Sequence, residues 1–368
     1  MEIIQSTQNQ NPNEFSSPDD EELLKFIEQA KPKIYIVGTG GSGSNTISRM
    51  VDMNIDGATL IAMNTDAQHL TRIKSHRKLL LGKKITRGLG AGSDPKVGED
   101  ATHESRDDVR HLIGDAQLVF ITCGMGGGTG TGSAPIIAHE AKEAGALTVG
   151  IVTLPFASEG KARMKSALDG LSKLKRVTDT TIIIPNDKLL NIAPDLPLNM
   201  AFKVSDEVLA NAAKGIVEMI TKPGMVNLDF ADLRSVLKDS GYAMIGMGES
   251  TSQQTKDRAI IAVENTLRSP LLDVDISTAR KALINIVGGS DLTLREAESI
   301  FQEVSSRIND DAMMKWGARI EPDMHKNSLK IMVVMGGVEY ADYSEDAAKK
   351  KLELEGNADL DGIFESGE

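Results

Sequence analysis

Short apolar runs alternate with helical stretches along the first half of the chain. The runs lie at residues 34–37, 59–64, 118–123, 147–154 and 180–185, and β-branched residues are frequent in them. Continuous apolar strands separated by helices are typical of a parallel sheet that is covered on both faces. We therefore predict an α/β domain, built from βαβ units, that ends near residue 198.

A long helix is predicted next, at about residues 198–221. Its apolar positions form a stripe too wide for a helix that buries only one side, so we expect it between two domains. Lys222-Pro223-Gly224 ends it. The chain to about residue 340 then predicts a mixed α+β domain. Its expected strands lie at 242–247, 282–287, 312–320 and 328–335, and its helices at 254–267 and 293–307.

These elements divide the chain into five parts. We expect a flexible arm with a short helix opened by Pro18 over residues 1–31, then an α/β domain over 32–198. A central helix over 199–222 and an α+β domain over 223–340 follow, and a polar tail occupies 341–368.

Composition limits the classes of function. The 368 residues carry 41 Lys and Arg against 53 Asp and Glu, and the net charge of −12 argues against a general nucleic-acid binder. The hydrophobic content of 40% is enough to bury two cores. A single cysteine, Cys123, excludes an intramolecular disulfide. No secretory signal and no apolar run of about 18 residues is visible. We expect a cytoplasmic protein without direct membrane insertion.

The first of three Gly-rich loops, Gly38-Thr39-Gly40-Gly41-Ser42-Gly43, follows the first strand and precedes a helix. Backbone N–H groups at a helix N-terminus bind phosphate, and glycine lets the backbone approach it closely. This G-x-G-x-x-G pattern alone usually indicates a dinucleotide site, and Asp66 follows the second strand where an acid could bind ribose. A dinucleotide-binding oxidoreductase is therefore one alternative.

The second loop, GMGGGTGTG at 124–132, favours a nucleoside triphosphate instead. Its successive N–H groups form an anion-binding nest, and the hydroxyls of Thr129 and Thr131 add donors. A dinucleotide enzyme has no obvious need for a second loop of this kind. A protein that binds a nucleoside triphosphate does, because it has three phosphates to hold. The third loop, GLGAGSDP at 88–95, fits a cover for a terminal phosphate and a plain loop equally well.

The loops lack the usual cationic partner of phosphate. None of the three contains lysine, and no G-x-x-x-x-G-K-[ST] motif occurs. Phosphate binding would depend on backbone donors, with charge compensated by Mg²⁺ held by phosphates and water. The six His residues show no HExxH or HxH arrangement, so we expect no catalytic metal site. Cys123 is interpreted as a buried small hydrophobe.

At this point the motifs identify a family. The segment at 124–132 resembles the signature of the tubulin/FtsZ superfamily. The similarity extends in order through Asn45, VTLPF at 152–156, IPNDKLL at 184–190 and NLDFADL at 227–233. It covers about residues 33–338 and is closer to FtsZ than to tubulin. TRGLGAGSDP at 86–95 and the early helix at 18–30 resemble archaeal FtsZ more than the tubulin-like CetZ branch.

The resemblance implies the tubulin/FtsZ fold and a GTP site. The fold has a Rossmann-like parallel-sheet GTP-binding domain, a long central helix and a smaller α+β C-terminal domain. Asp206 would accept hydrogen bonds from guanine N1–H and N2–H, which selects guanine over adenine. Phe202 would stack on the base. The implied GTP- or GDP-binding residues are Gly40, Gly41, Gly43, Asn45, Ala91, Gly92, Gly126, Gly127, Gly128, Thr129, Gly130, Thr131, Glu159, Arg163, Asn186, Phe202 and Asp206.

Asp229 and Asp232 admit two interpretations. On sequence alone they would cap the helix that begins with DLRSVLKD and complement its dipole. The resemblance implies a catalytic role, because in FtsZ-like proteins this loop completes the active site of the next subunit. There its acids would orient water for attack on the γ-phosphate.

The resemblance as a whole implies a GTPase of cell division. It would polymerise head to tail, hydrolyse GTP between subunits and form a mid-cell ring at the inner face of the membrane. LDGIF at 360–364 would bind a membrane adaptor of the SepF or FtsA type, although a solvated tail fits the composition nearly as well. Two alternatives are the oxidoreductase, which leaves 124–132 and NLDFADL unexplained, and a nucleotide-gated scaffold with little turnover.

Overall fold

The computed structural model describes residues 32–192, 197–251, 255–269, 271–272 and 275–338. The predicted arm and short helix before residue 32 lie outside the described residues. The same is true of the predicted tail after residue 338.

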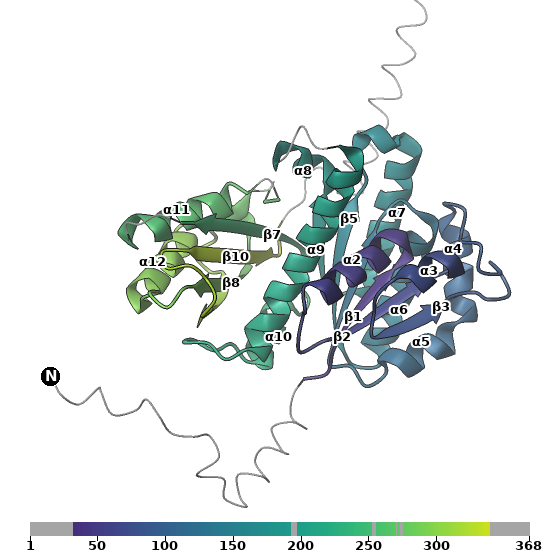
Figure 1. Ribbon diagram of the computed structural model, residues 1–368, viewed down its shortest axis with the longest axis horizontal. Coiled ribbons are helices and arrows are strands. Elements are labelled where there is room, and N and C mark those ends of the chain that lie inside the picture. The colour runs from purple at the N-terminus through teal and green to yellow at the C-terminus, as the bar shows by residue number, and fades with distance from the viewer. Residues whose placement is uncertain (1–31, 193–196, 252–254, 270, 273–274, 339–368) are drawn as a thin grey trace, which may run out of the picture. The chain divides into compact units, whose positions relative to one another are not determined.

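Strands from both halves of the chain join in one sheet within the described residues (Figure 1). The order is β3-β2-β1-β4-β5-β6-β7-β10-β8-β9. The strands are β1 (Ile34–Thr39), β2 (Thr59–Asn64), β3 (Arg77–Leu80), β4 (Leu118–Gly124), β5 (Leu147–Leu154), β6 (Thr180–Pro185), β7 (Gly241–Ser250), β8 (Lys281–Gly288), β9 (Met313–Ile320) and β10 (Leu329–Gly336).

Pairing is parallel from β3 through β7. β10 runs antiparallel to β7 and β8, and β9 is parallel to β8. The predicted α/β and α+β parts are therefore confirmed as the two ends of this sheet, joined where Thr180 of β6 pairs with Gly241 of β7. The sequence did not predict β3, because this strand is only four residues long and begins with two exposed basic residues.

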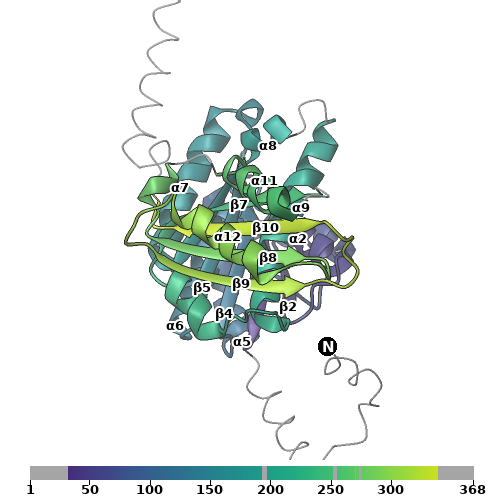
Figure 2. The same cartoon turned by 90° about the vertical axis from the view of Figure 1, so that its left-hand side faces the viewer.

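Helices cover both faces of the sheet. They are α2 (Gly40–Asp52), α3 (Ala67–Arg72), α4 (Pro95–Glu104), α5 (Arg106–Ile113), α6 (Gly128–Glu143), α7 (Lys161–Val177), α8 (Asn186–Ile192), α9 (Leu198–Thr221), α10 (Phe230–Leu237), α11 (Thr255–Leu267) and α12 (Leu294–Ser305). Figure 2 shows α11 and α12 lying over β7, β8, β9 and β10.

The hydrophobic residues form two clusters, one on each face. Alternation along β1 sends Tyr35 and Val37 to one cluster and Ile34 and Ile36 to the other. Residues of α4–α7, α11 and α12 belong to the first cluster, and residues of α2, α3 and α8–α10 to the second. Each cluster extends over both ends of the sheet. The two hydrophobic cores therefore correspond to the two faces of the sheet, and not to the two predicted domains.

The central helix α9 lies on the second face. It contacts α2, α8, β5 and β8, so it bridges the two ends of the sheet as its wide apolar stripe predicted. In Figure 1 α8 lies near the start of α9, and α10 lies near its end. Among the helices that the structure describes, none is both long and apolar enough to cross a bilayer.

Candidate functional site

The first and second Gly loops lie side by side because β1 and β4 are parallel neighbours. The loops follow the carboxyl ends of these strands and lead into α2 and α6. Gly40 has φ +75°, and a Cβ on it would lie 2.8 Å from the nitrogen of Gly130. The hydroxyls of Thr39 and Ser133 join the loops by a hydrogen bond of 2.5 Å. Glycine at position 40 is therefore required by both conformation and space.

The third Gly-rich loop, which the sequence left open, packs against the second. A Cβ on Gly128 would lie 2.9 Å from Cβ of Ala91 and 2.8 Å from the nitrogen of Asp94. The loop is also tied to the end of β2, where Gly90 N–H donates to the carbonyl of Thr65 over 3.2 Å. The structure thus brings all three loops to one edge of the sheet.

One glycine of each loop faces open space. A Cβ on Gly41, Gly92 or Gly127 would meet no other described atom within 4 Å. Both α2 and α6 begin without a side-chain cap, and the first N–H groups of a helix have no acceptor within it. The loops therefore present free backbone donors without side chains in front of them, which is the arrangement that binds phosphate.

The two threonine hydroxyls of the second loop form hydrogen bonds within the protein. Thr131 Oγ1 accepts from the N–H of Gly126 over 2.9 Å, and Thr129 Oγ1 pairs with Thr65 Oγ1 over 2.6 Å. We expected both hydroxyls as donors to phosphate. These hydrogen bonds shape the loop. Because Thr131 Oγ1 only accepts here, its own hydrogen remains available, and a role of both hydroxyls in binding phosphate stays a prediction.

Asp206 of α9 lies against the helix that follows the first loop. Its Oδ1 accepts from Thr46 Oγ1 at 3.1 Å and from Ser42 Oγ at 3.5 Å. Burial raises the pKa of this carboxyl to about 6, and the two hydroxyls and nearby Arg49 only partly oppose the effect. A poorly solvated carboxylate is unfavourable on its own and gains from a ligand that offers hydrogen-bond donors.

An aromatic pair lies near the start of α9. Phe202 is 39% exposed, and its ring meets buried Phe156 edge to face with centroids 5.4 Å apart. The Phe202 side chain is therefore partly exposed, as stacking on a base would require.

Three more predicted site residues follow the strands next to the second loop. Glu159 and Arg163 form an ion pair of 3.1 Å. A Cβ on Gly126 would lie 2.8 Å from Cγ of Arg163, so the arginine packs on the second loop. Asn186 is buried, and its Oδ1 accepts from Ser205 Oγ over 2.9 Å.

Asp229 and Asp232 lie elsewhere, at the start of α10. Asp229 is the N-cap residue and accepts from the N–H of Asp232 over 2.7 Å. Asp232 forms an ion pair of 2.7 Å with Lys315 of β9, and that ammonium holds the pKa of Asp232 below its ordinary value. The distance along α9 from Asp206 to Thr221 alone is about 22 Å. The two acids are therefore remote from the Gly loops of their own chain.

Several contacts of the site were not predicted. Asn64 ends β2, and Thr65 and His69 follow it. Their side-chain hydrogen bonds connect this segment to Thr129 of the second loop and to Asn45 of α2. The signal was present in the sequence as NTDAQH, a polar segment directly after a buried strand. Such segments at the carboxyl ends of parallel strands are where sites form.

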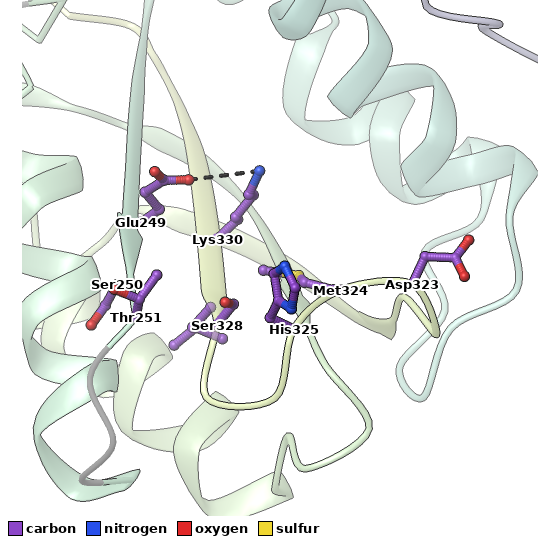
Figure 3. Close-up of a pocket in the computed structure, with 9 residues that line it drawn as sticks. Glu249, Ser250, Thr251, Asp323, Met324, His325, Ser328 and Lys330 are labelled. Carbon is purple, nitrogen blue, oxygen red and sulfur yellow. Dashed lines mark ion pairs between the residues drawn. The ribbon is translucent and has the colours of Figure 1, made fainter.

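Two pockets formed by described residues contain none of the predicted site residues. One of about 340 Å³ lies between the end of β7 and the β9–β10 connection (Figure 3). Glu249 and Lys330 line it and form an ion pair of 3.6 Å. Another of about 830 Å³ lies between α9 and β7–β10.

Cys123 is fully buried, which raises the pKa of its thiol to about 12 and agrees with its interpretation as a hydrophobe.

Known proteins share both parts of this architecture. The sequence model of the tubulin/FtsZ family GTPase domain matches residues 33–194, and that of the FtsZ family C-terminal domain matches residues 241–339. The chain is 52% identical over 353 residues to cell division protein FtsZ 1 of Pyrococcus abyssi, covering 95% of this chain and 94% of the relative. The chain belongs to the FtsZ family.

Solved FtsZ structures agree. The empty FtsZ dimer of M. jannaschii has 53% identity and a TM-score of 0.82, covering 88% of this chain and 93% of that one. CetZ2 from Haloferax volcanii, as a GTPγS-bound protofilament, shares the fold with a TM-score of 0.75 at 21% identity, covering 89% of this chain and 99% of that one. The predicted preference for FtsZ over the CetZ branch is confirmed.

Family membership identifies the reaction class. The FtsZ-family GTPase domain binds and hydrolyses guanine nucleotide, as the motifs predicted. The oxidoreductase alternative has no support. Asp66, its candidate ribose ligand, is the N-cap of α3 and accepts from the N–H of His69 over 2.9 Å.

Proposed function

We propose that this protein polymerises head to tail and that each GTP is hydrolysed between two subunits. The observation that carries the proposal is the separation of the predicted residues into two groups. The Gly loops, Phe202 and Asp206 form one group, and Asp229 and Asp232 form the other at the far end of α9. A single chain cannot bring both groups to one nucleotide, whereas a second chain stacked on the first can.

The geometry supports a division of labour in catalysis. Backbone donors of the three loops would hold the phosphates, and Asp206 and Phe202 would hold the guanine. Asp229 and Asp232 of the next subunit would orient the attacking water. Phosphoryl transfer needs mainly positioning and charge stabilisation, so delivering the acids in trans makes turnover conditional on assembly.

The nucleotide would bring Mg²⁺ with it. Within the part of the chain that the structure describes, no three His, Cys, Asp or Glu side chains gather as a metal-ligand set. A magnesium ion would therefore be ligated mainly by phosphate and water, and would neutralise phosphate charge when bound.

The filament would serve as the ring of cell division at the inner face of the membrane. A contact between two different surfaces of one chain does not close on itself, so it produces open filaments. M. jannaschii FtsZ, whose solved structure is a dimer, is consistent with self-association. We further propose that LDGIF at 360–364 attaches the ring to an adaptor of the SepF or FtsA type.

Two experiments test these proposals. Electron microscopy of the purified protein should show filaments with GTP that disassemble as phosphate is released. Filaments without phosphate release would support the nucleotide-gated scaffold instead, and GTP binding without filaments would contradict polymerisation.

For the tail, deletion of residues 357–368 should abolish capture of the adaptor in a pull-down, and unchanged capture would contradict that role.

A further inference from the structure

Side-chain hydrogen bonds connect the helix after the first Gly loop to the end of β2. The three residues are Asn45 of α2, His69 of α3 and Asn64, the last residue of β2. His69 Nε2 lies 3.1 Å from Asn45 Oδ1, and His69 Nδ1 lies 3.2 Å from Asn64 Nδ2. Asn45 is one of the predicted GTP-binding residues, whereas His69 has no predicted role.

Backbone contacts fix the orientation of the Asn64 amide. Asn64 is 3% exposed, and its Oδ1 accepts from the N–H of Thr65 over 2.9 Å and from the N–H of Asp66 over 3.3 Å. Turning the amide round would place its NH₂ group against two donors. The NH₂ group of Asn64 must therefore face His69.

The orientation of Asn64 in turn fixes the tautomer of His69. Because an NH₂ group only donates, Nδ1 of His69 must accept and carries no proton. In the neutral imidazole the proton is then on Nε2, which donates to Asn45 Oδ1. The ring thus acts as an acceptor toward Asn64 and as a donor toward Asn45.

The result is a defined orientation for Asn45. Its oxygen is taken by His69, so the two N–H donors of its amide remain for another partner. Asn45 is exposed and lies one helical turn after Gly41, whose Cβ position faces open space at the Gly loops. Donors in this place suit a phosphate or hydroxyl oxygen.

We propose that His69 is a positioning residue of the nucleotide site. Its neutral ring holds the Asn45 carboxamide so that Nδ2 donates to an oxygen of bound GTP. The same chain of contacts reaches the second loop, since Thr65 Oγ1 bonds to Thr129 Oγ1 over 2.6 Å. This inference rests on the proposed function, because it requires GTP at the three loops.

Substitutions at position 69 separate this role from simple packing. His69→Ala should weaken GTP binding about threefold to tenfold, the value of one net hydrogen bond. His69→Gln should restore most of the affinity, because its amide has one acceptor for Asn64 and a donor for Asn45. Gln68→Ala is the matched control, since Gln68 is on the same helix, is exposed and makes no side-chain hydrogen bond among the described residues. It should bind GTP like the wild type.

A double-mutant cycle tests the connection through Asn45. Calorimetry on nucleotide-free protein with added GTP gives Kd for the wild type, Asn45→Ala, His69→Ala and the double variant. If His69 acts through Asn45, the double variant should bind as Asn45→Ala does. Additive losses, normal affinity of either single variant, or failure of His69→Gln to restore binding would overturn the proposal. A wild type that does not bind GTP would instead contradict the proposed function.

Discussion

The acidic residues near the two ends of α9 lie in opposite electrostatic environments. Near its start, Asp206 is poorly solvated, its pKa is raised to about 6, and the neighbouring helices α2 and α6 begin without side-chain caps. Near its end, Asp229 caps α10, and the pKa of Asp232 is lowered by Lys315. One end has unsatisfied groups that a ligand can satisfy, whereas the other has acids that are already stabilised as anions.

Under the proposed function, this difference would make one chain an incomplete enzyme. Unpaired backbone donors and a desolvated carboxylate favour binding of an anionic ligand with an amide-rich base. Ionised, partly exposed acids are suited to attracting and orienting water, but their own chain offers them no phosphate. The following predictions test this contrast, from the largest expected effect to the smallest.

Asp232→Ala should abolish turnover while leaving GTP binding intact. Loss of a water-orienting group commonly costs at least about 100-fold in rate, and the Gly loops and Asp206 are untouched. Filaments should persist longer because GTP stays between the subunits. Phosphate release and equilibrium binding, measured on the same samples, check both statements.

Lys315→Met is the matched control for Asp232→Ala. Both substitutions break the ion pair of 2.7 Å, but only one removes the carboxylate. An exposed pair contributes little to stability, so Lys315→Met should retain most of the turnover. Equal loss in the two variants would assign the effect to the ion pair and contradict a catalytic carboxylate.

Asp206→Asn should weaken GTP binding about 10- to 100-fold, because charge-assisted hydrogen bonds to guanine are lost. The nucleotide-free protein should become more stable at neutral pH. The pKa of Asp206 is raised to about 6 in the folded state. The folded state therefore favours the neutral carboxyl: its contribution to the free energy of unfolding is fully present below the ordinary pKa and is lost as pH rises through 6 and the buried group ionises. We expect a gain of roughly 3 kcal/mol at pH 7 and none near pH 3. Denaturant unfolding at both pH values measures it.

Two glycines distinguish a position that is open to a ligand from a position that is closely packed within the protein. Gly127 has φ −88° and an open Cβ position, so Gly127→Ala should leave unfolding unchanged within about 0.5 kcal/mol. Its methyl group would nonetheless obstruct phosphate, and we expect about tenfold weaker GTP binding. A Cβ on Gly98 would lie 2.3 Å from the carbonyl oxygen of Gly128, so Gly98→Ala should cost about 1–3 kcal/mol of stability. Equal behaviour of the two variants would contradict this distinction.

Asp229 has a structural role that can be separated from catalysis. Asp229→Ala should destabilise the fold by about 1 kcal/mol, because the N-cap of α10 is lost. Asp229→Ser keeps an N-cap acceptor and should retain the stability. If Asp229 also serves the neighbouring nucleotide, both variants should lose turnover equally. Retained turnover in the serine variant would limit Asp229 to capping.

Much of the fold was predictable from local pattern. The strands 59–64, 147–154 and 180–185 and the helix 198–221 have the predicted bounds, because long apolar runs and a wide helical stripe leave few alternatives. The joining of both halves into one sheet was not predictable, since it depends on pairing between Thr180 and Gly241, which are distant in sequence. Local propensity contains no information about such a partner.

The site was predictable as motifs but not as contacts. The three loops were named from their motifs and Asp206 only from the family resemblance. Nothing in the sequence indicated that Asp206 would meet Ser42 and Thr46 across α2. Nor did the sequence indicate that Thr129 Oγ1 would bond to Thr65 and that Thr131 Oγ1 would accept from the N–H of Gly126. Hydrogen-bond direction depends on the three-dimensional neighbours, so it cannot be inferred from residue type alone.

The measurement that tests the central claim most directly is GTPase activity in a mixture of two inactive variants. One carries Asp232→Ala with intact Gly loops, and the other carries a damaged Gly127–Gly130 loop with intact Asp229 and Asp232. If the acids act on the neighbour's nucleotide, the mixture should hydrolyse GTP faster than the sum of the separate samples. Demonstrated co-assembly of the two variants without any recovery of activity would contradict a site shared between subunits.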